Sequence, residues 1–191
     1  SFRIAVSAAG VLLSVIILSA ACRNAEKISS GIARSGDAGR SAAREEVLRR
    51  AEQHLTQKRL IVDYYRIHRK LAYPLPVTRI DNPPVPVEDS FSYPWEIWML
   101  WELEERINCL GLAAEWTGAP RFREAAVQDL EALAAWESYN VQREPHLSVG
   151  HAARIMSLAL GGWDWLPSGL KETLEQACRR LVDQHAAWLQ G

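Results

Sequence analysis

Apolar residues recur at helical spacing in four segments of the second half of the chain, and these stripes are the strongest structural signal in the sequence. Gly118 followed by Pro120 is typical of one helix ending and the next beginning. Pro167 indicates in the same way that a new helix begins at the last segment. We therefore predict two antiparallel helical hairpins whose turns lie about 49 residues apart. The four predicted helices cover about 95–116, 121–136, 148–163 and 168–188.

An unbroken apolar run over residues 4–21, flanked by arginines, predicts an N-terminal export signal rather than an element of the fold. The run ends in LSAAC, which resembles a bacterial lipobox with Cys22 as the lipidated residue. We assign residues 1–22 to a signal/lipobox segment and expect export, as a periplasmic or outer-membrane lipoprotein or as a secreted protein. The alternatives are cleavage after Ala21, an uncleaved membrane anchor and a buried core helix.

Between the predicted signal and the hairpins, polarity and proline content divide the chain. Residues 23–43 are rich in Ser, Gly, Ala and Arg, which predicts a flexible linker. Residues 44–71 carry apolar positions at helical spacing and predict one long helix. Six prolines between Tyr73 and Pro94 predict an extended connector, so we treat 44–93 as a long helix plus a Pro-rich connector. No segment shows a strand pattern of substance.

Composition and charge narrow the class of protein. The chain has 191 residues, of which 48% are hydrophobic and 24% charged, and these values are typical of a folded domain. With a net charge of −1, the chain as a whole lacks the excess of basic residues that is typical of nucleic-acid-binding proteins. Residues 94–191 contain 14 acidic and 8 basic side chains and are mildly acidic. Cys109 and Cys178 lie in apolar helical patterns, and we favour two free thiols over one disulfide.

Four ordered segments of the second half resemble the heparinase II/III-like polysaccharide lyases. Ile107 to Trp136 resembles a family helix pair that is joined at "tGd" and ends in "ladW". Residues 145–153 are similar to the family's "dLdtaeia" segment, and residues 159–166 (ALGGWDWL) are similar to "alayDwLy". The segment that begins at Pro167 is similar to "lseeerakir". His146 stands where the family often has Asp, and Gly161-Gly162 replaces helix formers. The resemblance covers roughly residues 94–191.

The resemblance implies that residues 94–191 begin a partial (α/α) toroid of antiparallel hairpins, so the expected fold class is all-α. It also implies an exported lyase that cleaves uronic-acid-containing glycans by β-elimination. That reaction needs a group that neutralises the uronate carboxylate, a base and an acid. In the family Asn, His and Tyr fill these roles further along the fold, so we expect the catalytic residues beyond Gly191. The alternative is a non-catalytic, membrane-tethered helical-repeat protein that binds a glycan or a protein partner.

Trp136, Tyr139 and Asn140 are the first set of candidate substrate-binding residues. They stand at a predicted helix end and in the loop after it, where a toroid opens its cleft. An aromatic ring at this position is suited to stacking on a sugar. The alternative is a core tryptophan followed by a surface turn.

His146, His151 and Arg154 are the second candidate set. His151 and Arg154 lie about one helical turn apart and share a face, so together they could bind a substrate carboxylate. The alternative is a histidine near the helix start and a solvated arginine. No third ligand is spaced to join His146 and His151, and H-E-x-x-H and C-x-x-C motifs are missing, so we predict no metal site and no cofactor.

Trp95, Trp98 and Trp101 recur at every third position among the eight tryptophans of the chain. Such a stripe could line a carbohydrate groove, but core packing is the interpretation that we favour. The neighbouring Glu102, Glu104 and Glu105 are interpreted as a solvated face.

Overall fold

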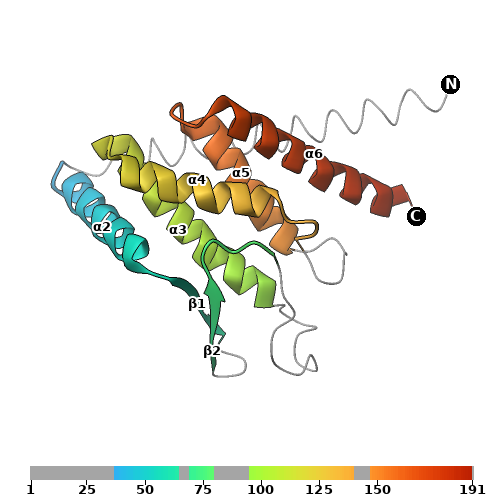
Figure 1. Cartoon of the computed structure of the whole chain (residues 1–191), viewed down its shortest axis with the longest axis horizontal. Helices are drawn as coiled ribbons and strands as arrows, with labels where there is room; N and C mark the ends of the chain where they lie inside the picture. The colour runs from blue at the N-terminus through green and yellow to red at the C-terminus, as the bar shows by residue number, and fades with distance from the viewer. Residues whose placement is uncertain (1–36, 65–68, 80–94, 140–146, 191) are drawn as a thin grey trace.

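The protein is predominantly helical in its computed structural model, which describes residues 37–64, 69–79, 95–139 and 147–190 (Figure 1). The segment predicted as the export signal and most of the Pro-rich connector lie outside the described residues. Among the described residues, no helix combines the length and the apolar character that crossing a bilayer requires. The described elements are helix α2 (Asp37–Thr56), strands β1 (Arg59–Tyr64) and β2 (Arg69–Pro74), and helices α3 (Trp95–Thr117), α4 (Pro120–Ala134), α5 (Leu147–Gly162) and α6 (Ser168–Gln190).

The two predicted helical hairpins are confirmed. Helices α3 and α4 run antiparallel, and so do α5 and α6, with both turns at the same end of the molecule (Figure 1, upper left). Gly118 closes α3 with a φ of 66°, a conformation that glycine adopts at no steric cost, and its N–H donates to the carbonyl oxygen of Ala114 at 2.9 Å. Pro120 begins α4, where the missing proline N–H is not needed.

The prediction of one helix over residues 44–71 was wrong. Helix α2 begins earlier, at Asp37 inside the predicted linker, and ends at Thr56, after which β1 and β2 form an antiparallel hairpin. The strand pattern is a short alternation: Leu60 and Val62 are buried, whereas Ile61 between them is exposed. That period of two is the strand signature, and the strong β-propensity of Ile61 and Val62 adds to it.

Helix α3 lies at the centre of the fold. It packs against α2, α4, α5 and β1, so it is covered on most of its circumference (Figure 1). One core cluster combines apolar side chains of the β-hairpin with those of both helical hairpins. A second, smaller cluster joins α2 to the C-terminal half of α3 and to α4. The described parts of residues 44–79 therefore share a core with the described helices of the predicted toroid segment.

Candidate functional site

Two of the predicted substrate-binding residues are core side chains. Trp136 is buried after the end of α4, and its Nε1–H donates to the carbonyl oxygen of Val77 at 2.8 Å. Tyr139 is buried beside it, and its hydroxyl donates to the carbonyl oxygen of Leu133 at 3.0 Å. Burial raises the pKa of Tyr139 to about 12. Trp136 thus has the core role that the sequence offered as the alternative to sugar stacking. Tyr139 is buried as well, so the surface turn expected after the tryptophan was wrong at this residue.

Three further predicted positions, Cys22, Asn140 and His146, lie outside the described residues. The side chain of Trp95 also falls outside the description, although its backbone begins α3. The structure does bring together His151 and Arg154, which were predicted to bind substrate, with Trp101, for which core packing was the favoured interpretation.

His151 and Arg154, one turn apart on α5, both contact Glu104 of α3. Arg154 Nη2 lies 2.6 Å from Glu104 Oε2, and His151 Nδ1 lies 3.3 Å from the same oxygen. The side chain of Glu104 is only 11% exposed, whereas that of Arg154 is 53% exposed. The buried carboxylate of Glu104 therefore binds both the imidazole of His151 and the solvent-facing guanidinium of Arg154 at the α3–α5 interface.

Trp101 extends this arrangement onto the surface. Its Nε1–H donates to His151 Nε2 at 2.6 Å, and its ring meets the imidazole edge-on with centroids 5.6 Å apart. Trp98 packs edge-on against the same indole at 4.7 Å. Trp101 is 40% exposed, which is unusual for so large an apolar side chain. We call Trp98, Trp101, Glu104, His151 and Arg154 the Trp101 cluster.

The hydrogen bonds of the Trp101 cluster assign the tautomer of His151. An indole N–H only donates, so Nε2 of His151 must carry the lone pair and Nδ1 the proton. The Nδ1–H then faces the carboxylate of Glu104, which is the acceptor that this tautomer needs. Both nitrogens of His151 are engaged in holding neighbouring side chains, so proton transfer to a ligand would require one of these bonds to break.

The Trp101 cluster offers two kinds of contact to a ligand. The exposed part of the indole is an apolar, flat surface against which a sugar ring could stack. The exposed guanidinium of Arg154 supplies N–H donors for an anionic group, and its contacts among the described residues use Nη2 alone. An aromatic surface beside a cation is the chemistry expected for binding an acidic saccharide.

Sequence reasoning missed the part that Glu104 plays. Glu102, Glu104 and Glu105 were interpreted as one solvated face, and for Glu104 this interpretation was wrong because its carboxylate is buried against α5. The spacing of Trp101 and Glu104, one turn apart on α3, matches the spacing of His151 and Arg154 on α5. The pairing of the two helices, some 50 residues apart in sequence, is not visible in local patterns.

Another buried charged pair lies on the other side of α3. Arg106 Nε donates to Asp129 Oδ2 of α4 at 2.7 Å, and both side chains are almost fully buried. Burial raises the pKa of Asp129, and the neighbouring guanidinium opposes this shift. Arg106 also donates from Nη1 to the carbonyl oxygen of His54, at the end of α2. This pair lies inside the fold and joins three helices, so it is a structural element.

Comparison with known proteins adds no relative: no family model matches the chain, and neither a curated protein nor a solved structure is significantly similar to it.

Proposed function

We propose that this chain is the N-terminal part of an exported polysaccharide lyase that acts on uronic-acid-containing glycans. In this proposal the two helical hairpins begin an (α/α) toroid, and the Trp101 cluster binds an acidic sugar of the substrate. Two consecutive antiparallel hairpins with their turns at one end are what the start of such a ring requires, which supports the proposal (Figure 1).

The observation that carries the proposal is the exposed Trp101 ring beside the exposed guanidinium of Arg154, linked through His151 and Glu104. A uronate has one apolar ring face and one carboxylate, and these two features match the indole and the guanidinium. Glu104 reduces the positive charge of the site, but it accepts only from Nη2. The other N–H groups of Arg154 remain suited to a substrate carboxylate.

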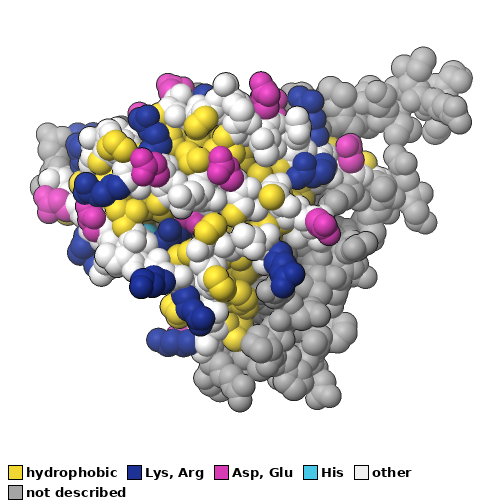
Figure 2. All heavy atoms as spheres, viewed as in Figure 1, with side chains coloured by type: hydrophobic (Ala, Val, Ile, Leu, Met, Phe, Trp, Pro, Cys, Tyr) yellow, Lys and Arg dark blue, Asp and Glu magenta, His cyan; other side chains and the backbone are white. Residues whose placement is uncertain are grey.

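The Trp101 cluster binds and positions the glycan; it does not carry the proton transfers of β-elimination. His151 is the one histidine of the cluster, and both of its nitrogens hold other side chains. The acid, the base and the group that neutralises the reacting uronate belong, by the family resemblance, to later parts of the fold. Residues 94–191 are mildly acidic, and acidic and basic side chains are interspersed on the face of the molecule seen in Figure 2.

Binding can be tested on this chain directly by isothermal titration calorimetry with oligouronates and with neutral oligosaccharides of equal length. We expect Trp101→Ala and Arg154→Met each to weaken oligouronate binding at least about tenfold, because aromatic and arginine contacts dominate such interfaces. The Arg154→Met effect should be absent for the neutral ligand. Arg179→Met is the matched control, since Arg179 is an exposed arginine that forms an ion pair with Glu175 on its own helix. Equal affinity of the wild type and the two cluster variants would exclude the Trp101 cluster as the glycan site.

A test of catalysis uses the protein encoded by the full-length gene. An ultraviolet absorbance assay for unsaturated uronate products, run over a panel of uronic acid polymers, tests the lyase activity. Binding through the Trp101 cluster without any elimination would instead support a non-catalytic, membrane-tethered helical-repeat protein. The tether is part of the proposal: palmitate should label the exported protein at Cys22, and equal labelling of a Cys22→Ala variant would refute the anchor.

A further inference from the structure

His54, Glu105 and Cys109 bring three metal-binding side chains together at the contact between α2 and α3. His54 lies in the last turn of α2, and Glu105 and Cys109 lie four residues apart on one face of α3. One ligand atom from each residue can be chosen so that all three lie within 4.8 Å of one another. The set combines an imidazole nitrogen, a carboxylate oxygen and a sulfur.

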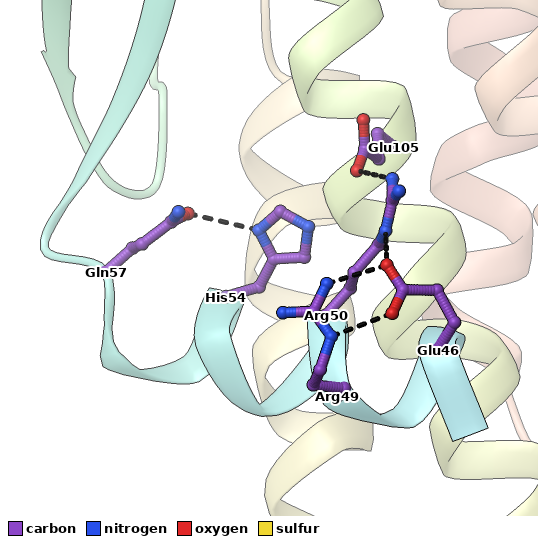
Figure 3. Close-up of polar contacts among 6 residues, drawn as sticks. All are labelled: Glu46, Arg49, Arg50, His54, Gln57 and Glu105. Carbon is purple, nitrogen blue, oxygen red and sulfur yellow. Dashed lines mark hydrogen bonds and ion pairs between the residues drawn. The ribbon is translucent and has the colours of Figure 1, made fainter.

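His54 is oriented as a metal ligand is. Its Nδ1 lies 3.1 Å from Gln57 Oε1, an acceptor, so the proton belongs on Nδ1 (Figure 3). The lone pair is therefore on Nε2, which is buried and has no hydrogen-bond partner among the described residues. A buried, unsatisfied acceptor is costly in a folded protein, and an imidazole fixed through its other nitrogen is the usual arrangement at metal sites.

The two ligands from α3 differ in exposure. Cys109 is a buried free thiol. The carboxylate of Glu105 is about half exposed, and its Oε1 accepts from Arg50 Nη1 at 2.6 Å (Figure 3). An exposed ion pair of this kind contributes little to stability, so Glu105 can give up this contact at small cost. Arg50 has a second acceptor in Glu46 and would stay paired.

In contrast to the sequence prediction of no metal site, we propose that His54, Glu105 and Cys109 form a binding site for a divalent transition metal ion of the zinc type. Nitrogen, oxygen and sulfur donors suit Zn²⁺, and three protein ligands leave a fourth tetrahedral position for water. Zinc bonds of about 2.0–2.3 Å would place the ligand atoms ~3.3–3.7 Å apart. The ligand atoms therefore move together by at most about 1.5 Å when the ion binds, a movement that a rotation of the half-exposed Glu105 side chain can supply.

The charges around the site balance when the ion is bound. Binding Zn²⁺ forms the sulfur–zinc bond and releases the thiol proton of Cys109 to solvent. The thiolate and the carboxylate then offset the two positive charges of the ion, and the complex is neutral. This matters because the guanidinium groups of Arg50 and Arg106 lie close to the imidazole and would oppose a net positive complex.

The test is a titration of the reduced full chain with Co²⁺, followed by competition with Zn²⁺. The wild type should develop a thiolate-to-cobalt charge-transfer band and the intense d–d bands of a tetrahedral ion, and Zn²⁺ should abolish both. Cys109→Ser should remove the charge-transfer band. Cys22→Ser and Cys178→Ser are the matched thiol controls, and His151→Ala is the histidine control; these three should bind Co²⁺ as the wild type does.

Two further variants distinguish a metal site from a merely structural cluster. Gln57→Leu removes the acceptor that orients His54 and should weaken metal affinity about 10- to 100-fold. Arg50→Met removes the competitor for Glu105 and should strengthen it. The proposal is overturned if excess Co²⁺ produces no charge-transfer band in the wild type. It is equally overturned if the band survives in Cys109→Ser and disappears in Cys22→Ser or Cys178→Ser. Should Cys109→Ser fail to fold, the wild-type spectrum and the opposite effects of Gln57→Leu and Arg50→Met decide the question.

Discussion

Removing Asp129 should destabilise this protein far more than removing any exposed carboxylate. The Asp129 side chain is 2% exposed and pairs with Arg106, which is 7% exposed, at 2.7 Å. Arg106 is also bound to the carbonyl oxygen of His54. This one guanidinium therefore joins α3 to α4 and to the end of α2. Asp129→Ala would leave it buried without a carboxylate, and water has little access to replace the lost bond.

The expected magnitude follows from the burial of the pair. Breaking a buried pair on one side costs about 3–5 kcal/mol, because the remaining charge is uncompensated. For a domain of this size, each kcal/mol lowers the melting temperature by about 2–4 °C, so Asp129→Ala should lower it by ~6–20 °C. The control is Glu52→Ala, which removes the ion pair between Arg121 and Glu52, both more than half exposed. Such a pair contributes about 0.2–1 kcal/mol.

The assay is thermal and urea unfolding followed by far-ultraviolet circular dichroism. The double variant Arg106→Met/Asp129→Leu should recover most of the stability, since replacing both charges by apolar groups is close to neutral. Arg106→Met also removes the bond to the carbonyl of His54, so a deficit of about 1 kcal/mol should remain. The reasoning would be refuted if Asp129→Ala cost no more than Glu52→Ala, or if the double variant were less stable than Asp129→Ala.

Two other substitutions test the packing and the burial described above. Gly111→Ala places a Cβ into the six-membered ring of Trp163 and should lower the free energy of unfolding by about 1–3 kcal/mol. The Cβ added by Gly150→Ala meets open space on α5, so this change should raise the free energy of unfolding by up to ~1 kcal/mol through helix propensity. Comparison of the melting temperatures of the two variants with that of the wild type checks both expectations. The raised pKa of Tyr139, about 12 against an ordinary value of 10.0, means that the unfolded chain loses this proton first as pH rises. The contribution of Tyr139 to the free energy of unfolding is complete below pH 10 and falls by about 2–3 kcal/mol towards pH 12. Urea unfolding should therefore show that Tyr139→Phe loses less stability at alkaline pH than the wild type does. Equal losses in the two proteins would contradict the burial of Tyr139.

The helical hairpins could be predicted because their signals are local. Each helix repeats its apolar positions over three turns or more, and Gly118 and Pro120 mark the turn between two of them through backbone geometry alone. The β-hairpin lacked such a signal. Val62 stands seven residues after Leu55 and so continues the apolar spacing of the preceding helix. Leu60, Ile61 and Val62 are all apolar, and only the exposure of Ile61 reveals the alternation of a strand. Exposure depends on the packing of α3, which lies more than 30 residues further along the chain.

The candidate site was predicted in part for the same reason. His151 and Arg154 could be placed on one helical face from their spacing, and the structure puts both against Glu104. Trp136 could not be assigned to the core from local sequence, because the carbonyl that its indole binds belongs to Val77. An aromatic residue at a helix end has the same local sequence pattern whether it faces a cleft or packs on a neighbouring segment. Only the tertiary contacts distinguish these two positions.

The central position of α3 explains why both proposed sites lie along it. A helix packed on most of its circumference has little solvent-facing surface, so its polar side chains need partners on other elements. Glu104, Glu105 and Arg106 are consecutive and point about 100° apart, and they contact α5, α2 and α4 respectively. Departures from apolar patterning concentrate at functional or strained positions. If the triplet served packing alone, apolar replacements of Glu104 and Glu105 would leave glycan and metal affinity unchanged. The two proposals require that each replacement abolish or weaken one of these affinities while the fold persists.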